Sequence, residues 1–247
     1  MKKYLSVFSL VARESMVRVS LLWALSAAVQ TAVFYTNMFS ERVLENKIIS
    51  NAFNAYTDRI GLSYVFSFTL LLTGILLMKT GMEFRTKTGY TLRRLRISEK
   101  QVYVIQALYN CIMIFLLFVF EVSLCFALAN WGTTFIRADY ITNQTVYLTF
   151  YSTAFIHEIF AGRNIVTVIR NIIFIIALGF NLSAFSYLWR RGSKYIFGIL
   201  VLSAAVFIFW TSPGFNYTEN IPVALTAVGT LLIALGIVRS RREEYDS

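Results

Sequence analysis

The 247-residue chain is poor in the residues that build metal centres and disulfide frameworks. It has one histidine, His157, so a zinc site that needs a second histidine four residues later is excluded. Its two cysteines, Cys111 and Cys125, lie in one apolar run, without metal-ligand spacing and without a loop partner for a disulfide. We therefore expect no metal site, and we expect both cysteines to be small core residues.

Charge and proline are scarce as well. Only 15% of the residues are charged and 57% are hydrophobic, with two prolines in the whole chain. Soluble domains are typically about 25% charged and about 45–50% apolar. The aromatic share of 16% suits membrane cores and interfacial belts. The composition predicts an all-α, polytopic integral membrane protein that forms a single transmembrane domain over residues 1–247.

Six apolar runs are long enough to cross a bilayer, which takes about 20 residues. They cover residues 19–38, 60–78, 103–131, 171–189, 195–211 and 221–238. A seventh run at residues 145–162 contains His157 and Glu158, and its insertion would move the later basic loops outside. We expect it to form an external or interfacial helix within an external loop at residues 132–170.

The distribution of lysine and arginine predicts the orientation. With the N-terminus inside, 17 of the 23 basic residues fall in cytoplasmic segments. Cytoplasmic loops carry such an excess. The pattern predicts a multi-pass protein of the cytoplasmic membrane, with the N-terminus and the C-terminus both in the cytoplasm.

The first 18 residues have one polar and one apolar face at helical spacing. The polar face carries Lys2, Ser6, Ser9 and Arg13. The apolar face carries Tyr4, Val7, Phe8 and Val11. This pattern predicts a helix at residues 1–18 that lies in the membrane interface and leads into the first span. A signal peptide is the less favoured alternative, because charged residues follow the apolar stretch without a cleavage site.

Glu121 is the one acidic residue inside an expected span. An acidic group is costly in hydrocarbon and marks a candidate functional site, here in the translocation pathway. The structural alternative is a protonated or hydrogen-bonded carboxyl that faces another helix, beside Asn110 or Asn181. A proton relay is disfavoured, because no second acid or histidine accompanies Glu121 within the spans.

The connector at residues 83–101 between the second and third spans is strongly basic. Ser98 and Gln101 have capping-box spacing, which predicts that the third-span helix begins near Glu99. The segment 91–97 reads as a short surface helix with Leu92 and Leu95 three residues apart and arginines around them. These arginines could simply meet anionic headgroups. A docking element for a soluble partner would use the leucines as well.

A nucleotide site in the chain itself is not expected. The stretch "GMEFRTKT" at residues 81–88 approaches a phosphate-binding loop, but Thr86 stands where glycine is required before the lysine. No expected strand precedes the stretch.

The layout resembles the permease subunits of bacterial type-2 ATP-binding-cassette (ABC) exporters. These proteins similarly have an N-terminal elbow helix, six spans with both ends inside, and a basic coupling helix between spans two and three. The most specific likeness is an acidic residue followed by "GYTLRRLRISEKQ". The resemblance implies that ATPase coupling involves Glu83, Tyr90, Leu92, Arg93, Arg94, Leu95 and Arg96. The chain departs from many relatives in its short last external loop and its long loop after span three.

The resemblance also implies partners and a function. The chain would move a peptide or other amphipathic substrate outward, as small permeases for antimicrobial-peptide immunity or peptide-toxin export do. ATP and magnesium would be bound by a separate cytoplasmic ATPase, so the chain itself would have no catalytic residue and no cofactor. A second permease subunit, identical or related, and membrane lipids would be further partners, and nucleic acid would not.

Two alternatives without an ATPase partner remain. A secondary transporter would be expected to show internal repeats or broken helices. An oligomeric channel would need polar rings, to which Glu121 could contribute. A membrane-bound enzyme would need a cluster of catalytic groups, which one histidine and one buried acid do not supply.

Overall fold

The computed structural model describes five helices and a few shorter pieces of the chain. The described residues are 2–38, 62–80, 98–134, 144, 146–147, 154–159, 165–190, 202, 227–230, 232–233 and 237. The helices are α1 (Lys2–Met38), α4 (Leu62–Thr80), α6 (Glu99–Thr133), α8 (Ala154–Ile159) and α9 (Ile165–Arg190). No strand occurs in these residues, which agrees with the expected all-α class.

Four of these helices, α1, α4, α6 and α9, are long and apolar enough to cross a membrane. They contain or overlap the first four expected spans, and they make the chain a membrane protein. Of the expected spans at residues 195–211 and 221–238, the structure describes only residue 202 in the first and residues 227–230, 232–233 and 237 in the second, so neither span is tested as a helix.

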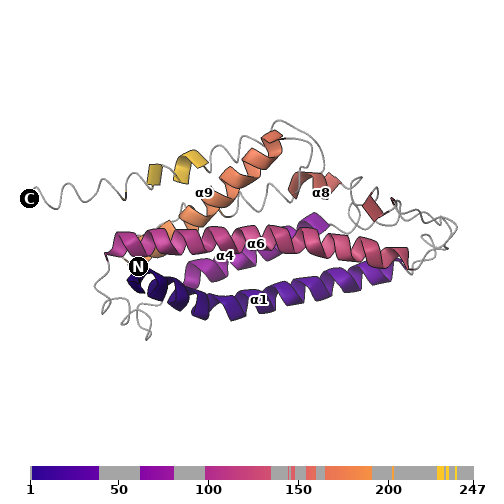
Figure 1. Cartoon of the computed structure of the whole chain (residues 1–247), viewed down its shortest axis with the longest axis horizontal. Coiled ribbons are helices and arrows are strands. Elements are labelled where there is room, and N and C mark those ends of the chain that lie inside the picture. The colour runs from indigo at the N-terminus through magenta and orange to yellow at the C-terminus, as the bar shows by residue number, and fades with distance from the viewer. Residues whose placement is uncertain are drawn as a thin grey trace, which may run out of the picture.

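The spanning helices alternate in direction. Pairs of bonded side chains show that α4 runs antiparallel to α1, since Trp23 contacts Thr73 and Ser26 contacts Thr69. Helix α6 runs parallel to α1, and α9 runs antiparallel to α6 (Figure 1). The start of α1, the end of α4, the start of α6 and the end of α9 therefore all lie at one end of the bundle.

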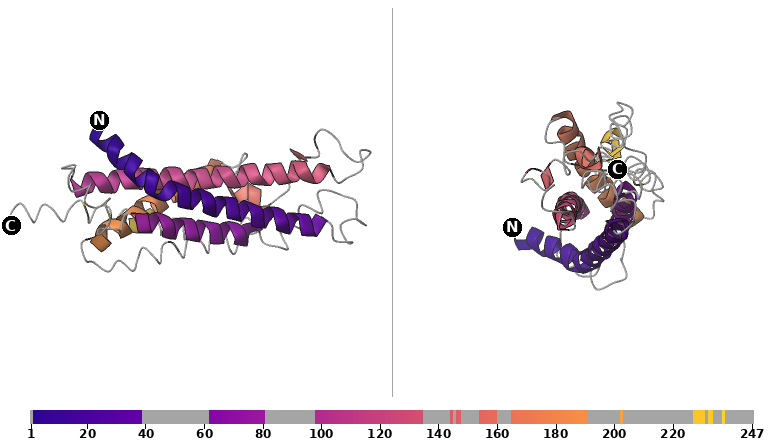
Figure 2. Two further views of the ribbon diagram at one scale, coloured as in Figure 1. Left: turned by 90° about the horizontal axis from the view of Figure 1, so that it is seen from below. Right: turned by 90° about the vertical axis from the view of Figure 1, so that its right-hand side faces the viewer.

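Helix α1 is continuous from residue 2 to residue 38, so the structure shows no separate interfacial helix at residues 1–18. The physical reason is that the segment contains neither glycine nor proline to interrupt it. Figure 2 shows the first turns of α1 inclined away from the rest of the helix. The predicted faces are confirmed in part: Val7 and Val11 are buried and Ser9 and Arg13 are exposed, but Tyr4 of the expected apolar face is 45% exposed.

Helix α6 begins where the capping signal predicts. Ser98 is its N-cap, and the Ser98 side chain accepts a hydrogen bond from the Gln101 backbone N–H at 3.4 Å. The Gln101 side chain, however, donates to the Tyr4 hydroxyl of α1 at 3.2 Å. With 35 residues, α6 is about 52 Å long and exceeds the roughly 30 Å hydrocarbon thickness.

The external-loop prediction is tested only in part. Of the run at residues 145–162, the structure describes residues 146–147 and the six-residue α8. Its Phe155 packs edge-on against Phe66 of α4 at 5.6 Å, and the Asn171 side chain donates to the Ile159 carbonyl at 3.0 Å. Helix α8 is far too short to cross a bilayer.

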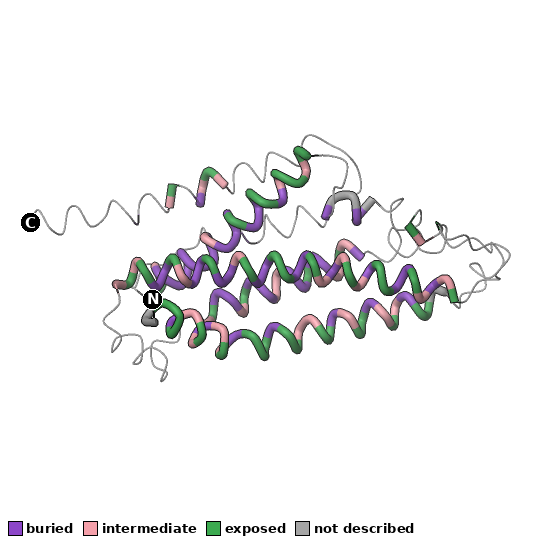
Figure 3. Tube along the Cα trace, in the orientation of Figure 1, coloured by how far each residue is buried: buried purple, intermediate pink, exposed green. Residues whose placement is uncertain are grey.

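The core lies between the long helices. Buried residues form stripes on the sides of α1, α4, α6 and α9 that face one another, and exposed residues follow the outer sides (Figure 3). Many of the exposed side chains are large and apolar, such as Leu21 and Leu25 of α1 and Ile169 and Ile172 of α9. Apolar outer faces suit helices that are surrounded by lipid.

Candidate functional site: a buried polar network across three helices

Glu121 is completely buried in α6, on the side that faces α1. Gln30 of α1 is equally buried, and its side-chain Nε2 donates a hydrogen bond to Glu121 Oε1 at 2.8 Å. The expected neighbours were wrong, because Gln30 rather than Asn110 or Asn181 is bonded to Glu121. Asn110 lies three turns nearer the start of α6 on nearly the same face, and there its side chain donates to the Gly179 carbonyl of α9 at 3.5 Å.

The contact continues from α1 into α4. Gln30 Nε2 also donates to Ser26 Oγ at 3.4 Å, and Ser26 Oγ is 2.9 Å from Thr69 Oγ1. Thr69 donates its hydroxyl proton to the Val65 carbonyl at 2.8 Å, so Ser26 must donate in the Ser26–Thr69 bond. The direction of donation is therefore fixed from Gln30 through Ser26 to Thr69. Hydrogen bonds that are aligned in such a chain strengthen one another in a medium of low dielectric constant.

Helical spacing explains how these residues meet. Ser26 and Gln30 are four residues apart and share a face of α1, as Thr69 and Thr73 share a face of α4. Thr73 receives a further bond at 3.3 Å from the indole nitrogen of Trp23. The sequence analysis missed Gln30, Ser26 and Thr69. Their signal was the recurrence of polar residues at a spacing of four within otherwise apolar runs.

The carboxyl of Glu121 is bonded on one side only. Its Oε2 atom is buried and has no hydrogen-bond partner among the residues that the structure describes. Cys125, one turn further along α6, is also buried. The described residues contain no group of three acidic, cysteine or histidine side chains that could hold a metal ion.

A second set of polar contacts joins α6 to α9. Ser183 donates to the Tyr103 carbonyl at 2.8 Å, and Gln106 donates to the hydroxyl of Ser186 at 3.2 Å. The Ser186 hydroxyl in turn donates to the carbonyl of Met78 in α4 at 2.8 Å. The backbones approach closely here, because a Cβ added at Gly179 would lie 2.8 Å from the backbone nitrogen of Cys111.

The cysteines agree with their expected role. Both are free thiols. Cys125 is buried in the core, and Cys111 is half-buried against α9.

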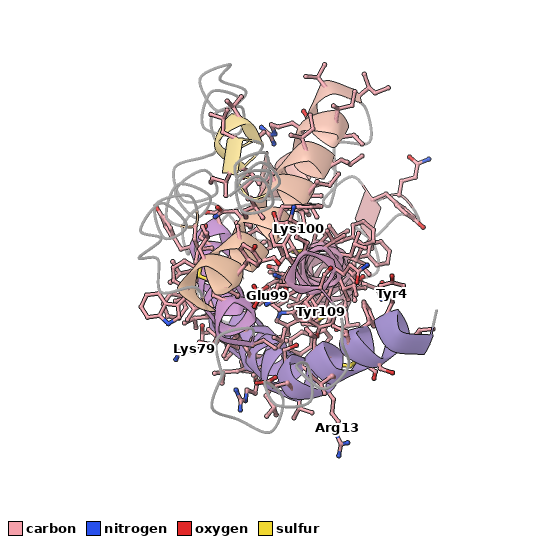
Figure 4. The ribbon with its side chains drawn as sticks, turned by 90° about the vertical axis from the view of Figure 1, so that its left-hand side faces the viewer. Tyr4, Arg13, Lys79, Glu99, Lys100 and Tyr109 are labelled. Carbon is pink, nitrogen blue, oxygen red and sulfur yellow. The ribbon has the colours of Figure 1, made fainter. Side chains whose placement is uncertain are left out.

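The expected coupling residues lie outside the described part of the chain. They are Glu83, Tyr90, Leu92, Arg93, Arg94, Leu95 and Arg96. The structure does place the two helix ends that this connector joins. Figure 4 looks onto that end of the bundle and shows Lys79 of α4, Glu99 and Lys100 of α6, and Arg13 of α1, whose side chain points away from the bundle.

At the same end, α1 is fastened to the first turns of α6. The Ser15 hydroxyl lies 2.6 Å from the Tyr109 hydroxyl, and the rings of Phe8 and Tyr109 meet edge-on at 5.5 Å. Together with the Gln101–Tyr4 bond, these contacts join the start of α1 to the part of α6 that directly follows the connector.

No family model matches the chain, and no curated protein and no solved structure matches it either.

Proposed function

We propose that the chain is the permease subunit of an ABC exporter in the cytoplasmic membrane. The observation that carries the proposal is the placement of the two helix ends that the basic connector joins. The connector joins α4 to α6 at the end of the bundle where α1 begins and α9 ends. The described basic residues near that end include Arg13, Arg18, Lys79 and Lys100, and the connector is the most basic stretch of the sequence.

In this proposal, residues 91–97 dock on a cytoplasmic ATPase that binds ATP and magnesium. Leu92 and Leu95 fill an apolar groove of that partner, and Arg93, Arg94 and Arg96 reach its acidic rim or the adjacent lipid headgroups. Closure of the ATPases moves the connector, and the movement enters α4 and α6 directly. It reaches α1 through the contacts of Gln101 and Tyr109 with the first turns of that helix.

The substrate is a peptide or another amphipathic molecule that moves outward, and a second permease subunit completes the pathway. Glu121 lies between α1 and α6, so a substrate meets it only when these helices separate. The alternative is a secondary transporter or oligomeric channel that works without an ATPase.

The test is purification of the tagged chain from its native membrane together with its bound subunits. We expect an ATP-hydrolysing subunit to copurify. Leu92→Ala combined with Leu95→Ala should weaken that association or uncouple transport from ATP hydrolysis, because buried anchors typically contribute about 1 kcal/mol or more each. Arg94→Ala should give a milder loss that depends on ionic strength.

Two outcomes would contradict the proposal. Absence of any ATPase from the wild-type preparation would favour the secondary transporter or channel. Normal coupling in the double leucine variant would leave the basic cluster as an orientation signal only.

The orientation has its own test. Single cysteines at Asn46, Asn143 and Asn216 should react with a membrane-impermeant thiol reagent in intact cells, and one at Ser193 should not. Labelling of the cysteine at Ser193 in intact cells would contradict the predicted orientation.

A further inference from the structure

The pairing between Glu121 and Gln30 leaves a chemical problem at the second carboxyl oxygen. Gln30 Nε2 donates a hydrogen bond to Oε1 of Glu121. Oε2 of Glu121 is buried without a hydrogen-bond partner among the described residues. A carboxylate oxygen that is buried in a membrane bundle loses its hydrogen bonds to water, and without a new partner this loss costs free energy. Either a bound ion or a proton must compensate for the negative charge.

Among the described residues, no basic side chain of a neighbouring helix forms a hydrogen bond with Glu121. On α1 the nearest basic residue along the helix is Arg18, twelve residues and about 18 Å from Gln30. On α4 it is Lys79, ten residues and about 15 Å from Thr69. Helix α9 packs on α6 and has Arg170 in its second turn and Arg190 at its end, and Arg170 forms no hydrogen bond with the Glu121 carboxyl.

The described part of the chain has other titratable groups on α6 and on the helices that pack against it. Cys125 lies one turn from Glu121 on the same helix. The short helix α8, which also contacts α6, contains His157 and Glu158. The one hydrogen bond to the Glu121 carboxyl among the described residues comes from a neutral amide, which is weak compensation for a buried charge.

The side chain of Gln30 offers the missing acceptor. A carboxamide carries an N–H donor and a C=O acceptor on one planar group, and a protonated carboxyl carries the complementary O–H and C=O. With a proton on Oε2, Glu121 can donate to Gln30 Oε1 while Gln30 Nε2 donates to Glu121 Oε1. The two side chains then close a ring of two hydrogen bonds between α1 and α6.

We infer that Glu121 and Gln30 form a neutral carboxylic acid–carboxamide pair, in which a proton bound to Glu121 is the ligand that fastens α6 to α1. Loss of this proton leaves Oε2 facing the carbonyl oxygen of Gln30 without a donor between them, so that two acceptors repel each other. The second N–H of Gln30 is already donated to Ser26, so the amide cannot rotate without breaking the chain to Thr69. The inference does not depend on an ATPase partner.

Infrared difference spectroscopy of the purified protein in lipid at neutral pH tests the pair. The C=O stretching band of a protonated carboxylic acid is separate from the bands of carboxylates. We expect wild type minus Glu121→Gln to show a carboxylic-acid band. Glu121→Gln should still fold, since two facing carboxamides can close the same ring.

Two further variants separate the pair from a merely buried acid. Gln30→Leu should shift the band to higher frequency, because the carboxyl loses its hydrogen-bond partner. Gln106→Leu is the matched control, since Gln106 is also buried but bonds to Ser186 on the α9 side. It should leave the band in place.

A difference spectrum with only carboxylate bands would overturn the inference and indicate a bound cation. An unchanged band in Gln30→Leu would also overturn it, because the acid would then be neutral without its amide partner. Should Glu121→Gln fail to fold, wild-type protein with glutamate labelled by ¹³C at the side-chain carboxyl supplies the same answer. An isotope-shifted acid band at neutral pH supports the pair, and its absence contradicts it.

Discussion

Helix α6 has polar contacts with two groups of neighbouring helices, and the two groups of contacts are built differently. Toward α1 and α4 the bonds run from side chain to side chain, from Gln30 to Glu121 and through Ser26 to Thr69. Toward α9 the acceptors are mostly backbone carbonyls, as in the bond from Ser183 to Tyr103. Small residues on α9 let the backbones approach there, as Gly179 does beside Cys111.

The difference indicates which helices can move relative to one another. A backbone carbonyl is fixed by its own helix, so a bond to it fixes the register of the partner. Close approach at small residues adds packing that any displacement would lose. Side-chain networks can exchange partners through rotamer changes. We infer that α6 and α9 move as one body and that α1 can shift against them.

The largest loss of stability is expected from adding a methyl group where the backbones of α6 and α9 approach closely. Gly179→Ala places a methyl group 2.8 Å from the backbone nitrogen of Cys111, which cannot move without displacing α6. Overpacking of this kind typically costs about 1–3 kcal/mol. Thermal unfolding in detergent should show a clear loss of stability.

Gly74→Ala is the matched control. The added methyl group would meet the Cδ1 atom of Leu202 at 2.6 Å, which is the end of a flexible side chain. That side chain can turn away, and alanine favours the helix by about 0.8–1 kcal/mol over glycine. A larger loss at Gly74 than at Gly179 would contradict the view that α6 and α9 form the rigid pair.

The next effect concerns the polar network between α1 and α6. Gln30→Leu leaves the buried carboxyl of Glu121 without its donor, which typically costs about 1–3 kcal/mol. The double variant Gln30→Leu with Glu121→Leu removes both partners and should recover much of that loss, since no polar group is left unsatisfied. Additive losses in the four-protein thermal unfolding cycle would show that the two residues are not coupled.

The sequence predicted the features of the fold that local chemistry determines. The N-cap at Ser98 follows from its hydroxyl and its position before an apolar run, and the buried face of α1 at Val7 and Val11 follows from helical spacing. The absence of glycine and proline from the first 38 residues also favoured the continuous helix, although we expected a break.

The partner of Glu121 could not be predicted in the same way. It depends on which helices are neighbours and on their relative register, and both are set by packing over the whole bundle. Glu121 could be singled out as an acid within an apolar run, yet Asn110, three turns earlier on nearly the same face of α6, bonds to α9 and not to the network. Gln30 became recognisable only once α1 lay beside α6.

The smallest losses of stability are expected for three serine-to-alanine substitutions. Their order should follow the number of hydrogen bonds that each serine makes between helices. Ser26→Ala breaks two bonds of the side-chain network, because Ser26 accepts from Gln30 and donates to Thr69. Ser183→Ala breaks one, and the Tyr103 carbonyl remains bonded within its own helix. Ser9→Ala breaks none between helices, because its hydroxyl bonds the Ser6 carbonyl of α1.

Single hydrogen bonds between membrane helices average about 0.6 kcal/mol. We therefore expect the loss of stability to be largest for Ser26→Ala, about half as large for Ser183→Ala, and close to zero for Ser9→Ala in parallel thermal unfolding measurements. A loss at Ser183 that exceeds the loss at Ser26 would indicate that backbone acceptors contribute more than the connected network. The α1 contact would then be only a weak addition to a bundle held chiefly by α6 and α9.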